Sequence, residues 1–381
     1  MSVEVADTER AGPKLTKKWF AVWAVIGLLV SLAGSTAAHD NSNPQPGEKI
    51  DRSMTVDPQA IVTLCVASGT LKVRGWDKNE IHVRSMDAAK IEFRRIDKVK
   101  DTTTPANRVD VMVLDRTTAA NPRLDCQALA SVEMDVPAGA TVQVQTRDGD
   151  ITITGIAAAY AGSQNGDIEI DHVTKVVEAG SLGGSIYLKD SSGRVNLSSA
   201  GGIVEVTNVR PATDEDTLEV GTVSGDIQLN HVSTPKVSVK TVNGTVTMTG
   251  PLAKSGEYGF QNTSGDLILA MPRDASFRLN AKVSEKHSIV SDFVLKYLSE
   301  VPPPPPAKPG KPAAESKPPK TPEAKGKVMP RTGPIVTPVV VEKPTVVTAP
   351  YVLRRVNAIC GSGDASISIA SFGGTVSLKK I

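Results

Sequence analysis

Aromatic residues are scarce in this chain: phenylalanine, tryptophan and tyrosine together make up 4% of its 381 residues, although hydrophobic residues make up 40%. Compact enzyme domains usually fill their core with more aromatic bulk, so the composition disfavours an ordinary globular enzyme. The apolar residues are mostly valine, isoleucine, leucine and alanine. β-Branched side chains pack well on pleated strands. The composition therefore predicts an all-β chain with a thin interior.

Motifs for catalysis and cofactor binding are also missing. The sequence has no GxSxG, HExxH or GxxxxGKS/T pattern and no CxxC or His/Cys metal-ligand spacing, the patterns that mark common hydrolase, metal and phosphate sites. We therefore predict no enzyme activity, no catalytic or cofactor-binding residue and no cofactor. A nucleic-acid partner is excluded as well, because the folded part offers no basic face with side chains set to stack on bases.

Cysteine is rare, and the number is odd: Cys65, Cys126 and Cys360. In an oxidising compartment three cysteines allow one disulfide and leave one thiol. Cys65–Cys126 is a possible pair, but sequence does not establish its geometry. A buried, inert thiol is the alternative for Cys65, which lies in an apolar strand pattern.

No apolar run is long enough for a permanent membrane-spanning helix. The longest, Trp19–Gly34, has 16 residues, short of the ~20 that span a bilayer. Three lysines (Lys14, Lys17 and Lys18) precede it and small residues follow at 35–38, which is the pattern of a signal peptide. The alternative is an uncleaved anchor, the one way in which this chain would contact a membrane. We expect residues after 38 to be exported, to a periplasm or a cell surface.

Glycine, in contrast, is abundant, and it marks an internal repeat. Apolar residues recur at positions −7 and −5 before a glycine and at +2 and +4 after it. One unit consists of Val142, Val144, Gly149, Ile151 and Ile153. Others centre on Gly69, Gly225, Gly244, Gly265 and Gly374. A spacing of two places both side chains of a pair on one face of a strand, so the pattern predicts about twenty short strands joined by turns.

The repeat glycines are predicted to be turn residues. Turn-forming residues such as Asn165 and Ser224 precede them, and glycine adopts the positive φ that many turns require. The predicted structural glycines are Gly69, Gly149, Gly166, Gly184, Gly202, Gly225, Gly244, Gly265, Gly363 and Gly374.

Two architectures fit this rhythm. In a β-solenoid, each strand pairs with its counterpart one coil away around a narrow interior. In an antiparallel meander or sandwich, each strand pairs with its sequence neighbour. The repeat stays in register over a long stretch and its interior residues are slim, which favours the solenoid. Dipeptides such as Asn165-Gly166 favour hairpins instead. Residues 80–135 are less regular and more charged, as in an end repeat with capping character.

Proline clusters late in the chain: 15 of the 26 prolines, with eight Lys or Arg, lie in residues 301–350. Proline stops a strand ladder, so this segment is expected to be a disordered or polyproline insert. We predict a signal peptide or anchor at 1–38, a linker at 39–55, a β-repeat domain at 56–300, the insert at 301–350, and further repeats of the same domain at 351–381.

Aspartates that follow repeat glycines are calcium candidates, because calcium takes several oxygen ligands. They are Asp150, Asp167, Asp226, Asp266 and Asp364. Coils with Ser185, Ile203 or Thr245 at the same position break the series. The alternative is that the aspartate side chains stabilise the turns. In that case the chain has no metal site.

Two other groups suggest chemistry. Asp148 and Asp150 are paired carboxylates, as in glycoside hydrolases, but a turn glycine separates them. His172 and His231 occupy equivalent repeat positions and could be metal ligands. Other units place glycine or asparagine there, which favours a turn position that tolerates histidine.

Several segments together carry a resemblance. The Gly-Asp-Ile turns, Gly75-Trp76-Asp77, Val136-Pro137-Ala138-Gly139-Ala140 and Gly361-Ser362-Gly363-Asp364-Ala365 resemble the bacterial "putative adhesin" family of β-strand-repeat domains of unknown function. The resemblance covers residues 50–300 and 350–381. It implies an exported, right-handed β-helix-like fold and a role in adhesion, and the family pattern has no catalytic residues. The insert departs from that pattern.

Three functions follow as hypotheses. The first is a non-enzymatic binding module of the cell envelope, whose exposed strand faces contact a glycan or an envelope protein. The second is a structural or regulatory envelope protein. The third is a β-helix enzyme that acts on carbohydrate.

Overall fold

The computed structural model describes residues 49–96, 104–115, 126–284, 286, 288–298 and 353–381. All of them belong to one structural unit, Pro46–Ile381. The regular structure of the described residues consists of 26 β-strands. Within the described residues, no helix has the length and apolar character needed to cross a membrane.

The strands form two faces, which we call sheet A and sheet B. In order along the stack, sheet A contains β3 (Glu80–Ser85), β6 (Val132–Pro137), β2 (Leu71–Trp76), β8 (Ile151–Thr154), β10 (Ile168–Asp171), β12 (Ile186–Lys189), β14 (Val204–Thr207), β16 (Ile227–Asn230), β18 (Val246–Thr249), β20 (Leu267–Met271), β26 (Val376–Lys380) and β22 (Ile289–Ser291). Sheet B contains β4 (Lys90–Arg95), β5 (Ala106–Leu114), β1 (Ile50–Ser68), β7 (Thr141–Asp148), β9 (Ala158–Ser163), β11 (Val176–Ser181), β13 (Arg194–Ser199), β15 (Thr217–Ser224), β17 (Lys236–Asn243), β19 (Glu257–Ser264), β25 (Ala365–Ser371), β21 (Phe277–Ser284), β24 (Leu353–Cys360) and β23 (Lys296–Tyr297).

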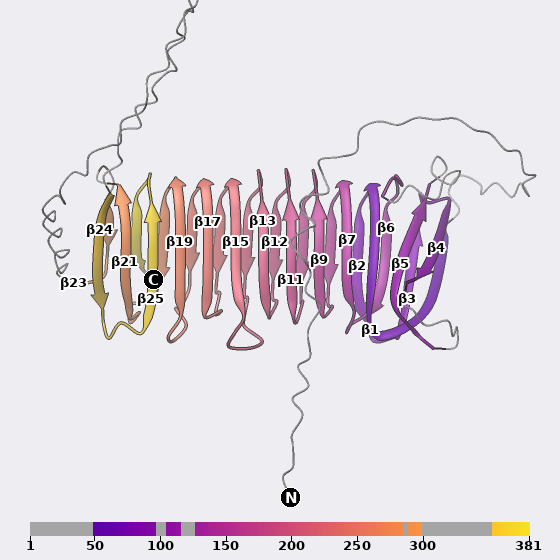
Figure 1. Cartoon of the computed structure of the whole chain (residues 1–381), viewed down its shortest axis with the longest axis horizontal. Coiled ribbons are helices and arrows are strands. Elements are labelled where there is room, and N and C mark those ends of the chain that lie inside the picture. The colour runs from indigo at the N-terminus through magenta and orange to yellow at the C-terminus, as the bar shows by residue number, and fades with distance from the viewer. Residues whose placement is uncertain (1–48, 97–103, 116–125, 285, 287, 299–352) are drawn as a thin grey trace, which may run out of the picture. The chain divides into compact units, whose positions relative to one another are not determined.

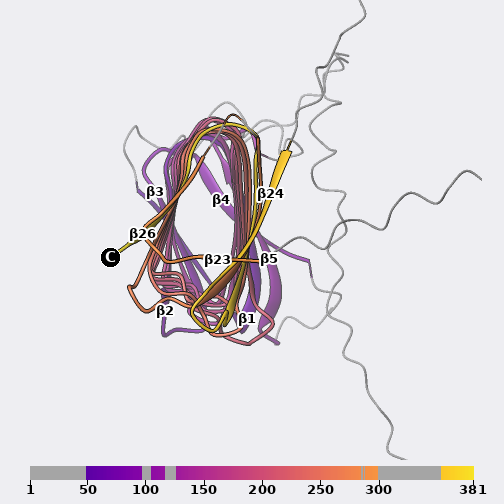
Figure 2. The ribbon, with the colours of Figure 1, turned by 90° about the vertical axis from the view of Figure 1, so that its left-hand side faces the viewer.

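The chain alternates between the two sheets and so winds as a solenoid. Each coil consists of one strand of sheet B, a corner, one strand of sheet A and a second corner. Strands pair in parallel with their counterparts one coil away, as β10 does with β8 and β12. Figure 1 shows the strands side by side along the stack, and Figure 2 shows the two sheets facing each other across the interior. The β-solenoid prediction is confirmed, and the meander is excluded.

The core is the space between the sheets, and the repeat positions fill it. In the unit around Gly149, Val142 and Val144 of β7 and Ile151 and Ile153 of β8 are at most 1% exposed. The corresponding residues of other coils stack above and below them in one continuous buried cluster. Burial of each such side chain stabilises the fold by about 1.5–3 kcal/mol. The narrow interior explains why slim aliphatic residues replace aromatic ones.

The repeat glycines form one column, which we call the glycine corner, where the chain passes from sheet B to sheet A. The reason for glycine differs from the prediction. Positive φ occurs at Gly69, Gly244, Gly265 and Gly374, but not at the five column members between 149 and 225. A Cβ at any of these positions would overlap backbone of the adjacent coil: at Gly184, the carbonyl group of Gly166. The column therefore requires glycine because successive coils approach closely. Gly363 lies outside this column, between β24 and β25.

A buried hydroxyl ladder lies inside the glycine corner. The Ser181 hydroxyl accepts the N–H of Gly184 at 2.9 Å and donates to the carbonyl of Gly166, one coil earlier, at 3.3 Å. Ser163 and Ser199 repeat both bonds in the neighbouring coils. Each serine thus links two coils and satisfies a buried glycine N–H, which would otherwise be costly.

Coil order differs from sequence order at both ends of the stack. The last coil in sequence, β25 and β26, lies between β19/β20 and β21/β22. Figure 1 shows β25, in yellow, between β19 and β21. At the other end, β1 and β2 lie between β5/β6 and β7/β8. The described part of the irregular segment predicted at 80–135 makes that end, where the first residues of β1 lie in sheet A and pair antiparallel with β3, and β4 pairs antiparallel with β5.

Several sequence predictions concern boundaries and cysteines. β1 begins at Ile50, so the end of the predicted 39–55 linker is strand. The predicted signal segment and the 301–350 insert lie outside the described residues. Cys65 and Cys126 form a disulfide with a Cα–Cα distance of 4.8 Å. Cys360 is a buried free thiol, and burial raises its pKa.

Candidate functional site

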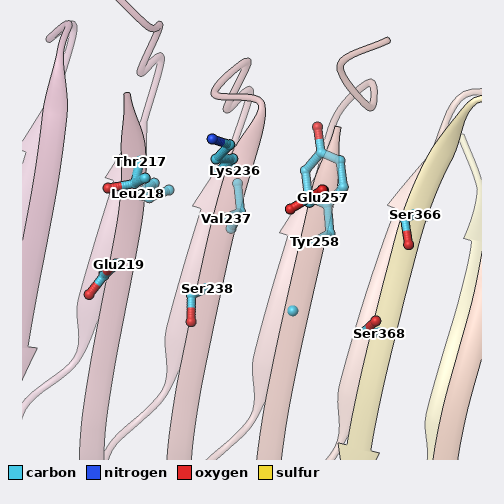
Figure 3. Close-up of a pocket in the computed structure, with 11 residues that line it drawn as sticks. Thr217, Leu218, Glu219, Lys236, Val237, Ser238, Glu257, Tyr258, Ser366 and Ser368 are labelled. Carbon is cyan, nitrogen blue, oxygen red and sulfur yellow. The ribbon is translucent and has the colours of Figure 1, made fainter. Parts of the chain in front are cut away.

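An open hollow lies on the outer face of sheet B, over β15, β17, β19 and β25 (Figure 3). Its volume is about 380 Å³. The residues that line it are Thr217, Leu218, Glu219, Lys236, Val237, Ser238, Glu257, Tyr258, Gly259, Ser366 and Ser368. At its centre the outward positions carry small residues, Ser238 and Ser368, with no side chain at all at Gly259.

Strand register arranges the polar lining in two rows across the sheet. One row runs Glu219, Ser238, Gly259, Ser368. The other runs Thr217, Lys236, Glu257, Ser366. Neighbours in a row lie about 4.8 Å apart along the stack. The rows therefore offer hydroxyl groups and charges of both signs at a regular spacing.

The charged groups of the hollow are available to a ligand. Lys236, Glu219 and Glu257 are exposed, and none of them has an ion-pair partner within the described part of the chain. Tyr258 is different, because it is buried and its hydroxyl accepts the N–H of Ala253 at 2.6 Å. Burial raises the pKa of Tyr258, and this hydrogen bond opposes the rise. Tyr258 thus supports the end of the hollow as a neutral structural residue.

The predicted calcium aspartates bind backbone N–H groups of the next coil. The Oδ1 atoms of Asp150, Asp167, Asp226 and Asp266 each accept the N–H at the equivalent position one coil on, at 2.7–3.0 Å. Asp150 and Asp167 lie in adjacent coils, whereas the coil with Thr245 separates Asp226 from Asp266. Asp364 lies in the β24–β25 turn and accepts Ser362 Oγ at 2.9 Å. The contacts of the first four aspartates link adjacent coils, whereas that of Asp364 lies within its own turn.

The paired carboxylates Asp148 and Asp150 do not form a hydrolytic pair. The Asp148 carboxylate accepts Asn165 Nδ2 at 2.7 Å and Arg147 Nε at 2.8 Å. These two hydrogen bonds, that from Asn165 first, lower the pKa of Asp148. A general acid for glycosidic cleavage needs a raised pKa. The arrangement therefore disfavours the carbohydrate-enzyme hypothesis at this position.

In the six coils whose sheet A strands run from β8 to β18, the second corner, where the chain returns from sheet A to sheet B, has a residue with positive φ; we call it the left-handed corner. It consists of Gly155, His172, Asp190, Asn208, His231 and Gly250, with φ between 45° and 137°. Histidine, asparagine and aspartate tolerate this conformation better than most residues. The expected turn role of His172 and His231 is confirmed. Two coils separate them, a distance of about 14 Å, so they are not ligands of one ion.

One constellation at this corner escaped the sequence reasoning. Asp171, His172 and Asp190 each place a ligand atom within 4.8 Å of the others. Asp171 Oδ1 lies 2.7 Å from His172 Nδ1, and Asp190 Oδ1 accepts Asn208 Nδ2 at 2.9 Å. Asp190 follows 18 residues after His172, so only the coil register brings it alongside.

A charged network covers the first coils of sheet A. Asp135 is 2% exposed, and its carboxylate contacts Arg74 at 2.8 Å and Arg84 at 3.0 Å. His82 lies 3.7 Å from the same carboxylate and also pairs with Asp51. A buried carboxylate needs such partners, so the network is explained by the stability of this end.

Comparison with known protein families gives one match. Residues 62–286 match the family model described as Toastrack DUF4097. The sequence matches no curated protein.

Three solved structures are similar to the chain. A putative adhesin from Parabacteroides merdae is 10% identical, with a TM-score of 0.38 over 59% of this chain and 90% of that one. A putative adhesin from Parabacteroides distasonis is 9% identical, with a TM-score of 0.26 over 59% and 91%. A putative cell adhesion protein from Clostridium sporogenes is 8% identical, with a TM-score of 0.19 over 88% and 100%.

Proposed function

This chain belongs to the Toastrack DUF4097 family, and we propose that it is an exported, non-enzymatic binding module of the cell envelope that holds a glycan on sheet B. The observation that carries the proposal is the hollow over β15, β17, β19 and β25. Its two rows of hydroxyl and charged groups match a hydrated polymer that lies along the stack. Hydroxyl-rich ligands are bound by hydrogen bonds from such groups.

The chemistry of the hollow supports binding rather than turnover. Its lining contains no histidine, cysteine or aspartate, and its two glutamates belong to different rows. Glycosidases need two carboxylates on opposite sides of one bond, one of them with a raised pKa. The hollow is open and also leaves the ligand in contact with water, where electrostatic stabilisation of a transition state is weak.

Two features support export. The N-terminal lysines, the apolar run Trp19–Gly34 and the small residues after it form a signal pattern. The Cys65–Cys126 disulfide is typical of oxidising compartments and rare in a reducing cytosol. N-terminal sequencing of the protein recovered from its cells tests this part. A chain that starts near residue 39 in the exported fraction is expected, and an intact chain in the cytosol would contradict it.

Ligand binding is tested with a filled hollow. A Cβ at Gly259 meets Val237 O at 3.8 Å, an ordinary contact, so Gly259→Trp places an indole over the hollow without disturbing the core. Gly162 is the matched control: it lies on the same face in β9, and its Cβ would meet Gln145 Cγ at 3.7 Å. Gly162→Trp adds the same side chain away from the hollow.

The assay is binding to an array of envelope polysaccharides, followed by titration of each glycan bound. We expect the wild type and Gly162→Trp to bind alike and Gly259→Trp to bind at least tenfold more weakly. Equal binding by all three proteins would place the ligand elsewhere. Shorter glycan products in the same incubations would show that the protein is an enzyme.

A further inference from the structure

We propose that Asp171, His172 and Asp190 bind one divalent transition-metal ion at the left-handed corner. The three side chains come from two adjacent coils. Strands β10 and β12 pair with each other, and in this register Asp171 lies opposite Lys189. That register sets His172 beside Asp190. One nitrogen and two carboxylate oxygens lie within 4.8 Å of one another. The proposal is independent of glycan binding, since this corner is remote in sequence and sheet from the hollow.

The separations suit closure around an ion. Metal–ligand bonds of about 2.0–2.2 Å place neighbouring ligand atoms roughly 3–3.5 Å apart. Asp171 Oδ1 and His172 Nδ1 are already 2.7 Å apart. The His172 side chain is 63% exposed, and Asp190 is exposed as well. Small rotations of these two side chains therefore suffice, while the backbone of both coils stays fixed by the strand ladder.

The carboxylate of Asp171 already faces the imidazole of His172. Asp171 Oδ1 is shielded from solvent, and it lies 2.7 Å from His172 Nδ1. Lys189, opposite Asp171 in β12, pairs elsewhere, because its Nζ contacts Glu169 at 3.4 Å. A shielded carboxylate oxygen needs a positive partner, and a metal ion bound by both side chains would supply one.

A second contact orients the other carboxylate. Asn208 Nδ2, one further coil on, donates to Asp190 Oδ1 at 2.9 Å. Hydrogen bonds of this kind fix the position of a ligating carboxylate and leave its other oxygen free. The corner residues of three successive coils thus cooperate: His172 and Asp190 as ligands, and Asn208 as their support.

The donor set selects the class of ion. Calcium takes six to eight oxygen ligands and magnesium keeps mostly water, so neither is favoured by an imidazole. One nitrogen and two carboxylates suit zinc, nickel or copper. Three protein ligands leave the remaining coordination positions to water or to a ligand atom from another molecule.

The chain contains a natural control at the same corner. His231 has the same left-handed conformation, with φ 54° against 53° for His172. Its flanking corner residues are Asn208 and Gly250, and Asn230 precedes it. No carboxylate accompanies it at those positions. If turn geometry alone created metal affinity, both histidines would bind.

Asparagine is the substitution of choice for the test. Asn208 occupies the equivalent position with φ 55°, so His172→Asn and His231→Asn should both fold. The untagged chain is titrated calorimetrically with zinc, nickel and copper chlorides. Copper-bound protein is examined by electron paramagnetic resonance, in which a coordinated imidazole nitrogen splits the signal.

We expect one ion per chain in the wild type and in His231→Asn. His172→Asn and Asp190→Asn should each bind at least tenfold more weakly, and His172→Asn should lose the nitrogen splitting. Wild-type affinity in His172→Asn, or no saturable binding of any of the three ions to the wild type, would overturn the proposal. Weaker binding in His231→Asn than in His172→Asn would overturn it too.

Discussion

A single methyl group at the glycine corner should destabilise the solenoid strongly. In Gly184→Ala, the new Cβ meets backbone alone: the carbonyl of Gly166 and the amide of Asp167. No flexible side chain can move out of the way, so the two coils must separate locally. Gly184 has no positive φ, and backbone conformation therefore contributes nothing to the effect.

The expected magnitude follows from three terms. Overpacking of this kind costs about 1–3 kcal/mol. Displacement of Gly184 also breaks the 2.9 Å bond from its N–H to Ser181 Oγ, which is worth about 1 kcal/mol. Alanine restricts the unfolded chain and returns about 0.4–1 kcal/mol. We expect the free energy of unfolding to fall by about 2 kcal/mol.

The control is a glycine in the same coil. A Cβ at Gly180 would meet Ser198 Oγ at 3.4 Å, an ordinary contact, so Gly180→Ala should stabilise by about 0.4–1 kcal/mol. Both variants are unfolded in urea and followed by far-UV circular dichroism. Slopes are compared along with midpoints, because a repeat stack need not unfold in two states. If Gly184→Ala is as stable as Gly180→Ala, close coil approach is not what selects glycine here.

Three further perturbations test the packing and the charges. Ser181→Ala should lower the free energy of unfolding in urea by about 1–3 kcal/mol, because a buried glycine N–H loses its acceptor. Thr222→Val should be neutral or stabilising, since the Thr222 hydroxyl is buried without a partner in the described structure. Equal losses of stability in the two variants would refute the hydroxyl ladder. Reduction of Cys65–Cys126, which closes a 61-residue separation, should lower the free energy of unfolding by roughly 4 kcal/mol, measured with and without reductant. Asp148 has a pKa below its ordinary 3.8 in the folded chain, so its hydrogen bonds stabilise the fold above about pH 4 and this contribution is lost as pH falls through the lowered pKa. Wild type and Asp148→Asn should therefore differ in thermal stability at neutral pH and converge in acid; a constant difference would contradict this.

The repeat was the most predictable feature, because burial alone imposes it. The spacing alone assigns Val142 and Ile151 to the core. When one face of a strand is buried, only one register buries all of its alternating apolar residues. The pairing partners were harder. Asn165-Gly166 resembles a hairpin turn, yet it forms a corner between two sheets. The serine three positions before the glycine distinguishes the two, because a hairpin has no adjacent coil for its hydroxyl to bind.

The candidate sites were less predictable because they depend on neighbours one coil away. Along the sequence the counterpart of His172 is His231, whereas its neighbour in space is Asp190. Reading the corner positions of successive coils as one column would have found the group. The hollow on sheet B had no such signal: glycine at 259 and serines at 366 and 368 are ordinary residues until β25 is placed beside β19.

The placement of β25 beside β19 also bears on how the stack of coils ends. Exposed edges of a parallel stack invite another chain to pair with them. Here both sequence-terminal coils are internal, each held between two neighbours. In sheet B the outer strands are antiparallel: β4, whose residue Arg94 pairs with Asp110, at one end, and β24 with the two-residue β23 beside it at the other. In sheet A the outer strands are the first residues of β1, antiparallel to β3, and the three-residue β22, which is parallel to β26. Antiparallel direction and short length both oppose continuation of a parallel ladder. The order of the coils therefore places antiparallel or short strands at the described edges, and this hinders growth of the solenoid end to end.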